Sequence, residues 1–113
     1  MQFAELPEFM REFKRLAKRF TSLVSDLDEF RLMLKELPRG TGGKHWNLLY
    51  DSETVSVIKT RMSCAYLRNS SFRIVYIYSK ETLRIEFIEL YFKGDKESED
   101  RGRIKEYLKS LGK

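Results

Sequence analysis

The sequence predicts an α+β fold, an antiparallel β-sheet of about four strands with two N-terminal helices packed on one face and a C-terminal helix near its edge. Two observations support this prediction. Apolar residues recur every three or four positions from residue 9 to residue 34, which is the spacing of an amphipathic helix. Residues 55–62, 72–78 and 83–92 are instead rich in Val, Ile, Tyr and Phe and are separated by turn-like sequences, as in a meander of strands.

The N-terminal part predicts one strand and a pair of helices. Residues 1–6 form a short, partly alternating stretch that stops at Pro7, so a first strand is expected there. Poor helix formers interrupt the helical pattern at residues 21–25, and Asp26 followed by Glu29 resembles a capping box. We therefore expect two helices packed as a hairpin, although one continuous helix fits the same apolar spacing.

A Gly-rich loop, RGTGGKHWN, follows Pro38, which ends the second predicted helix. Gly43 and Lys44 invite comparison with a phosphate-binding P-loop, but that pattern needs Gly at position 38 and Ser or Thr at position 45. The P-loop interpretation therefore fails. The loop could present Lys44, His45 and Trp46 as a mobile basic and aromatic edge, or it could hold His45 and Trp46 in structural contacts.

The C-terminal helix is expected to begin after Ser98, the candidate N-cap. Acidic residues then suit the first turn of the helix, where they face its positive end. One face of this helix would carry the apolar residues Ile104, Tyr107, Leu108 and Leu111.

The composition is that of one globular domain covering residues 1–113, with 42% hydrophobic and 35% charged residues. We find no apolar stretch long enough to span a membrane and no secretory signal, so a cytoplasmic protein is expected. The single cysteine, Cys64, cannot form an internal disulfide and is most simply a small buried side chain.

The net charge of +5 is concentrated in one segment of the chain. Residues 1–37 carry seven basic and seven acidic side chains, and residues 81–113 carry eight of each. Residues 38–80 carry seven basic side chains against two acidic ones. An excess confined to one segment indicates a basic surface for a polyanionic partner, although solvated side chains on half-exposed strands would look the same.

Period-two alternation in the first long strand separates its basic residues from its apolar ones. Ile58 and Met62 point to one face of the predicted sheet, and Lys59 and Arg61 point to the other. A hairpin with the next strand could bring Arg73 close to this basic pair, but the sequence does not determine the register.

The inventory of side chains leaves few kinds of chemistry open. One His and one Cys are too few for a Cys/His zinc site, and a nucleophile–His–acid triad would depend entirely on His45. Clustered Lys and Arg with nearby aromatic residues suit the binding of phosphates and the stacking of bases. Such a cluster could also cleave RNA through the ribose 2′-hydroxyl, with a lysine as base and arginines stabilising the phosphorane, and this chemistry needs no metal or cofactor.

The order of elements, together with VIKTRM, SSFRIVYIY and IEFIELYFKGDKESED before the final helix, resembles the RelE/ParE superfamily of type II toxins. The likeness is greatest to RelE and HigB-like members and covers residues 37–108. It implies that Lys59 and Arg61 bind phosphate or assist the base, that Arg73 stabilises the transition state, and that Lys93 or Lys96 contacts phosphate. The catalytic residues that follow are Lys59, Arg61 and Arg73, and the RNA or phosphate contacts are Lys44, Arg68, Lys93 and Lys96.

The same resemblance implies a function and partners. A member of this kind would cleave mRNA on the ribosome, leave a 2′,3′-cyclic phosphate, and be silenced by a cognate antitoxin, with no membrane partner. Two other functions fit the resemblance: a ParE-like inhibitor of DNA gyrase, and a degenerate homologue that only binds RNA or protein. Arg73 also has a structural alternative, pairing with Glu86 or Glu89 on the neighbouring strand.

Overall fold

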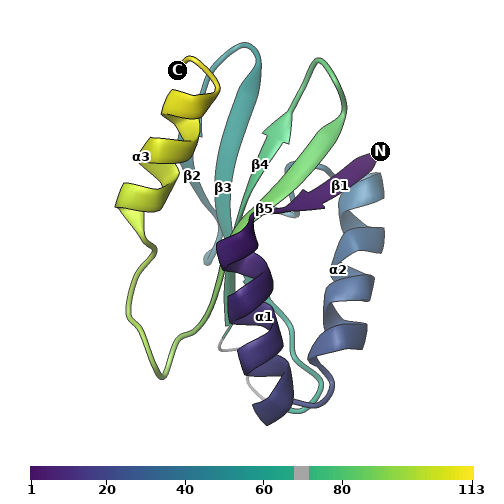
Figure 1. The fold of residues 1–113 in the computed structure, drawn as a ribbon. Helices are drawn as coiled ribbons and strands as arrows, with labels where there is room; N and C mark the ends of the chain where they lie inside the picture. The colour runs from purple at the N-terminus through teal and green to yellow at the C-terminus, as the bar shows by residue number, and fades with distance from the viewer. Residues whose placement is uncertain (68–71) are drawn as a thin grey trace.

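The computed structural model describes residues 1–67 and 72–113, and its centre is a five-stranded sheet with the strand order β1-β5-β4-β3-β2 (Figure 1). The strands are β1 (Gln2–Glu5), β2 (Asn47–Asp51), β3 (Val55–Met62), β4 (Phe72–Ser79) and β5 (Arg84–Phe92). The helices are α1 (Pro7–Arg19), α2 (Leu23–Glu36) and α3 (Arg101–Ser110). The predicted α+β class is therefore confirmed.

The sheet differs from the prediction in two respects. Strands β2 to β5 form an antiparallel meander, but β1 pairs with β5 in the parallel direction, with Phe3 opposite Ile85. The sheet is therefore mixed, because the direction of a strand beside a partner about eighty residues away is not encoded locally. The additional strand, β2, lies at an edge and is mostly exposed, so its sequence lacks the apolar alternation that reveals half-buried strands.

The N-terminal helices form the expected pair, with the break between Arg19 and Leu23. Pro7 occupies the first turn of α1, where its missing N–H costs nothing. The prediction of a capping box that begins at Asp26 was wrong, because Asp26 lies inside α2 and is buried. Its carboxylate accepts hydrogen bonds from the Ser22 hydroxyl (2.8 Å) and from the backbone N–H of Ala65 (3.1 Å). In the described part of the chain, no helix has the length and apolarity needed to cross a membrane.

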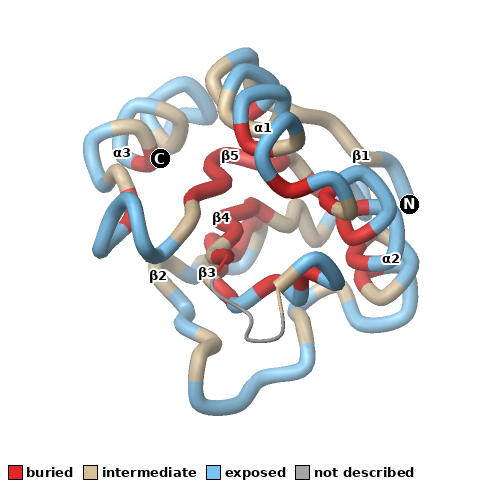
Figure 2. Tube along the Cα trace, turned by 90° about the horizontal axis from the view of Figure 1, so that it is seen from below, coloured by how far each residue is buried: buried red, intermediate tan, exposed pale blue. Residues whose placement is uncertain are grey.

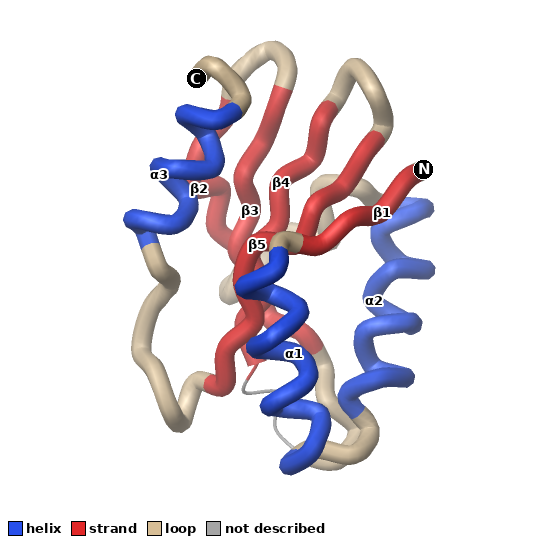
Figure 3. Tube along the Cα trace, in the orientation of Figure 1, coloured by secondary structure: helices blue, strands red, loops and turns tan. Residues whose placement is uncertain are grey.

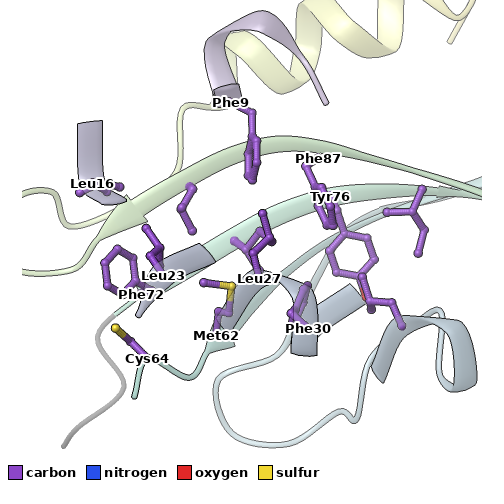
Figure 4. Close-up of a cluster of buried hydrophobic side chains, with 14 of the residues drawn as sticks. Phe9, Leu16, Leu23, Leu27, Phe30, Met62, Cys64, Phe72, Tyr76 and Phe87 are labelled. Carbon is purple, nitrogen blue, oxygen red and sulfur yellow. The ribbon is translucent and has the colours of Figure 1, made fainter. Parts of the chain in front are cut away.

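The apolar stripe of α1 and α2 packs on one face of the sheet and forms the main core (Figure 4). The rings of Phe9 and Phe87 stack with their centroids 5.2 Å apart, which joins α1 to β5. Buried segments run along the three central strands (Figure 2). The fully buried side chains in this core include Phe9, Leu16, Leu23, Leu27, Ile58, Met62, Phe72, Ile74, Tyr76 and Phe87.

Helix α3 covers part of the opposite face and lies apart from α1 and α2 (Figure 3). Ile104 packs there against a second apolar cluster that contains Val57, Val75 and Ile88. Leu49 and Tyr50 of the edge strand β2 pack against the same cluster, so the helix lies near this edge of the sheet as expected. The N-cap is Asp100, whose carboxylate accepts a 3.0 Å hydrogen bond from a backbone N–H, rather than Ser98.

A partly buried ion pair connects the two layers of helices. Arg103 of α3 donates two hydrogen bonds, of 2.9 and 2.8 Å, to the carboxylate of Glu12 in α1. Glu12 also accepts from the backbone N–H of Leu90, and Arg103 donates to the carbonyl of Ile88. β1 ends before these residues of β5, so the two side chains supply the hydrogen bonds that their backbone groups would otherwise lack. The same contacts hold α3 in place over the sheet.

Candidate functional site

A row of three side chains crosses the sheet on the face that carries α3. The β3–β4 register places Arg61 opposite Arg73, and the β4–β5 register places Arg73 opposite Tyr91. Directly opposite side chains in an antiparallel pair have Cβ atoms about 4.5–5.5 Å apart. Lys59 lies on the same face, two residues before Arg61, and is opposite Val75. The structure therefore brings together the three residues that the sequence selected as catalytic, on the face opposite the main core.

The fold holds the two arginines of this row next to each other, and their repulsion lowers the stability of the sheet. Like charges at opposite positions destabilise a sheet. Partial burial and the charge of Arg61 both lower the pKa of the Arg73 guanidinium, which nevertheless stays charged at neutral pH. An anion bound between the guanidinium groups would relieve the repulsion, and phosphate oxygens match their planar donors.

Arg73 does not form the structural ion pair with Glu86 or Glu89 that was the alternative to a catalytic role. Its guanidinium donates a 3.2 Å hydrogen bond to the preceding backbone carbonyl. Glu89 is instead hydrogen-bonded by Lys96, and Glu86 by the hydroxyl of Tyr107. Among residues 1–67 and 72–113, no carboxylate forms an ion pair with Arg73. Its charge is therefore not neutralised by either of the acidic residues on the neighbouring strand.

Lys59 has a buried acidic partner. Its ammonium group lies 2.7 Å from Oε1 of Glu99, whose side chain is 1% exposed, and Arg101 lies 3.0 Å from the other oxygen. Burial works to raise the pKa of Glu99, but the hydrogen bond from Lys59 and the nearby positive charges hold it below its ordinary value. Glu99 is therefore ionised at neutral pH, and Lys59 supplies a positive charge in a fixed position.

Tyr91 completes the row as a buried hydrogen-bond donor. Burial, together with the negative charges of Glu99 and Glu89, raises the pKa of its hydroxyl to about 12. Within the described ranges this hydroxyl is buried without a hydrogen-bond partner, which is rare in folded proteins. The ammonium group of Lys96 lies 5.6 Å from the centroid of the tyrosine ring. Tyr91 thus keeps its proton at neutral pH and has donor capacity that the fold does not use.

His45, in the Gly-rich loop, is half-buried and lies within the electrostatic reach of the arginine row. Partial burial and the positive charges of Arg61 and Arg73 lower the pKa of its imidazole, with smaller contributions from Lys44 and Lys93. The ordinary value of 6.5 is already below neutral pH, so the imidazole of His45 is neutral there and can accept a proton.

The predicted phosphate contacts occupy different surroundings. Lys44 is exposed in the Gly-rich loop, and Lys93 is exposed after β5, where it donates to a backbone carbonyl. Lys96 pairs with the buried carboxylate of Glu89 behind the row. Arg68 lies outside the described residues. Lys44 and Lys93 are therefore the lysines that could extend the positive surface around His45.

The sequence alone did not point to Tyr91 or Glu99. Tyr91 stands two residues after Glu89, so strand alternation places both on one face, and this was the only available signal. Glu99 is an acidic residue just before a helix, a position with an ordinary capping role. Its contact with Lys59 spans forty residues of sequence, and no local pattern reveals it.

The site is recognised by its cluster of positive charges and not by a deep groove. A groove of about 310 Å³ lies between β2 and α3 and has a mostly apolar lining that includes Leu49 and Ile104. It reaches the arginine row only through Glu99. No group of three or more potential metal-binding side chains occurs among the residues described.

The comparisons with known proteins identify the fold. No family model and no curated protein matches the sequence. The structure is similar to a chain in the crystal structure of the archaeal RelE-RelB complex from Pyrococcus horikoshii OT3, with a TM-score of 0.59 and 17% sequence identity. The match covers 82% of this chain and 94% of that one. At this identity the likeness concerns the fold alone, and on that basis the chain has a RelE-like toxin fold, as its resemblance to the RelE/ParE superfamily implied.

Proposed function

We propose that this protein is the toxin of a type II toxin–antitoxin pair and that it cleaves ribosome-bound mRNA without a metal ion. The observation that supports this proposal most directly is the pair formed by Arg61 and Arg73 on one face of the sheet. Two adjacent guanidinium groups without a neighbouring carboxylate between them suit a phosphodiester whose negative charge grows in the transition state. The likeness to a RelE chain adds independent support.

In the proposed reaction the 2′-oxygen of a ribose attacks the adjacent phosphorus and the bond from phosphorus to the 5′-oxygen breaks. The products are a 2′,3′-cyclic phosphate and a free 5′-hydroxyl. Arg61 and Arg73 would hold the non-bridging oxygens as charge develops on them. The 2′-hydroxyl gives its proton to a base, and the leaving 5′-oxygen takes one from an acid, for which the ammonium group of Lys59 is suitable.

His45 is the better candidate for the base. A base must be neutral before it accepts a proton, and Lys59 is bound to the ionised carboxylate of Glu99. Partial burial and the positive charges of the same arginines lower the pKa of the His45 imidazole. We therefore assign the proton transfer from the 2′-hydroxyl to His45 and a charge-supplying role to Lys59.

The proposed partners are mRNA on the ribosome and an antitoxin protein, and the proposed compartment is the cytoplasm. The similar structure is a complex of RelE with RelB, which supports a protein partner for this chain. A small open reading frame beside the gene, whose product co-purifies with this protein and prevents growth arrest, would be the expected antitoxin.

The test begins with purified protein that has been treated with EDTA to remove bound metal ions. This protein is incubated with ribosomes programmed with a defined mRNA, and the new RNA ends are mapped. Cleavage products carrying a 2′,3′-cyclic phosphate would support the proposal. Following mRNA and DNA synthesis after induction in cells separates it from gyrase inhibition, in which DNA synthesis stops before mRNA is lost. Binding of RNA without any cleavage would indicate a non-catalytic homologue.

A further inference from the structure

We propose that the groove between β2 and α3 binds an acidic amphipathic helix of a partner protein. This inference rests on the proposed function, which includes a protein partner, and it names the surface and the chemistry of that contact. The groove has a volume of about 310 Å³, near the lower end of ligand-sized sites. It lies at one edge of the sheet, where α3 runs beside the edge strand β2 (Figure 1).

The floor of the groove is apolar and mostly aliphatic. Leu49 and Tyr50 of β2 form one side, and Ile104 and Leu108 of α3 form the other. Ile104 is buried in the second apolar cluster, whereas the other three side chains are half-buried and keep part of their surface in contact with solvent. A partner that covers this surface removes it from water, which favours association.

Positive side chains form the α3 rim of the groove. Arg101, Lys105 and Lys109 are exposed and follow one another at intervals of four residues, so they form one stripe along the helix. Glu99 is the one carboxylate in the described lining, and it is buried and already shared by Lys59 and Arg101. In the described part of the chain, the ammonium groups of Lys105 and Lys109 have no hydrogen-bond or ion-pair partner.

This stripe indicates an acidic partner. Like charges four residues apart destabilise a helix, so a helix selected only for stability would place a carboxylate within the stripe. Carboxylates at the same spacing on a partner helix would share one side of it and would face Lys105 and Lys109. Apolar residues beside those carboxylates would then enter the groove, as amphipathic helices do in other apolar grooves.

The lining favours a protein helix over RNA. Binding of single-stranded nucleic acid depends on aromatic rings on which successive bases stack. Tyr50 is the one aromatic residue in the described lining, and its apolar neighbours Leu49, Ile104 and Leu108 are aliphatic. Phosphates would match the positive rim, but the aliphatic floor is better covered by the leucine or isoleucine side chains of a protein.

The N-terminal end of α3 brings the groove close to the reaction site. Glu99 lines the groove, and its Oε1 accepts a 2.7 Å hydrogen bond from the ammonium group of Lys59. Carboxylates of a helix bound beside Arg101 would therefore add negative charge near the arginine row, which opposes the binding of RNA phosphates. A partner in this groove would weaken RNA binding without covering the arginines.

The experiment measures the binding of three fluorescent stapled helical peptides to the full-length protein. The first carries a leucine stripe flanked by Glu, the second has Lys in place of Glu, and the third has Ser in place of Leu. Only the first should bind, and its affinity should fall with added salt. Lys105→Glu combined with Lys109→Glu should weaken this binding by about tenfold, the combined scale of two exposed ion pairs turned into repulsions. Leu49→Thr should also weaken it, because it removes apolar floor.

The matched control combines Lys14→Glu with Lys18→Glu, because these exposed lysines of α1 also stand four residues apart. The control should bind the Glu peptide as the wild type does, and both double variants should keep the wild-type melting temperature. Lys14 also lines a smaller groove between α1 and α2. Loss of peptide binding in the control alone would place the peptide there and overturn the proposal.

The outcomes separate this proposal from the nuclease function. Equal binding of the Glu and Lys peptides, or unchanged affinity when Lys105 and Lys109 are reversed, would overturn the docking surface and leave ribosome-dependent cleavage as it is. Loss of cleavage with peptide binding intact would overturn the nuclease alone. If no peptide binds and the Lys105 and Lys109 reversals weaken RNA binding more than the control does, the stripe is an RNA surface and the inference fails.

A second measurement tests the link to the reaction site. Wild-type protein saturated with the Glu peptide should bind a 2′-O-methyl RNA, which the proposed reaction cannot cleave, more weakly than the free protein does. An unchanged RNA affinity would overturn this link.

Discussion

Arg61 and Arg73 stand directly opposite each other on neighbouring antiparallel strands, on the face of the sheet that does not carry the main core. A sheet selected only for stability would place opposite charges, or apolar residues, at such positions. The repulsion between these guanidinium groups is consistent with selection for binding an anion.

Arg73→Ala should lower the cleavage of ribosome-bound mRNA by about two to three orders of magnitude, the scale of losing one preorganised transition-state donor. Arg73→Lys should also fail, because an ammonium group cannot contact two phosphate oxygens as a planar fork does. Stability should change by no more than about 0.5 kcal/mol, since the side chain is only partly buried and lies opposite a like charge.

Melting temperature and cleavage should be measured together, with Arg15→Ala as the control. Arg15 is exposed on α1, away from the site, and its removal takes away the same charge. Unchanged cleavage in Arg73→Ala, or a loss of cleavage matched by an equal loss of folding, would argue against the catalytic role of Arg73.

The rate of cleavage should depend on pH through His45. The lowered pKa means that the imidazole loses its proton below pH 6.5, so the rate should rise with pH in the acidic range and level off before neutrality. In His45→Gln this rise should disappear, together with about two orders of magnitude in rate, as expected for a lost general base. A pH dependence that persists unchanged in His45→Gln would argue against His45 as the base.

Glu99→Gln should destabilise the protein by about 2 kcal/mol, because it removes a charged partner from Lys59 in a largely buried setting. The folded-state pKa of Glu99 lies below its unfolded value, so its stabilising effect is present above about pH 4.5 and is lost as pH falls through the folded-state value. Urea unfolding at pH 7 and pH 3 should therefore show a smaller difference between wild type and Glu99→Gln at the lower pH. Glu97→Gln, at an exposed position nearby, should match the wild type at both.

Binding of RNA should weaken steeply with salt, because phosphate binding releases counterions. Removing Arg61 or Arg73 should reduce the slope of log K against log salt by about one each, and Arg15→Ala should leave it unchanged. The slope is obtained from titrations at several salt concentrations with an RNA that cannot be cleaved. Association that does not respond to salt would favour recognition of a protein partner over recognition of RNA.

The sequence by itself determined the local features of this protein. Apolar residues at helical spacing specified α1 and α2, because an amphipathic helix must bury one side. Strand alternation placed Lys59 and Arg61 on the face opposite Ile58 and Met62, since successive side chains of a strand point to opposite sides. The concentration of positive charge in residues 38–80 was also visible without coordinates.

Only the tertiary structure decided which of these residues meet. The register that places Arg61 opposite Arg73 depends on how two strands slide past each other, and a sheet that is apolar on both faces constrains that register weakly from sequence. The pairing of Lys59 with Glu99 and the effect of the arginines on the pKa of His45 join segments that are distant along the chain. Such contacts depend on the packing of α3 and the path of the Gly-rich loop, because they arise from the shape of the whole chain rather than from any local pattern.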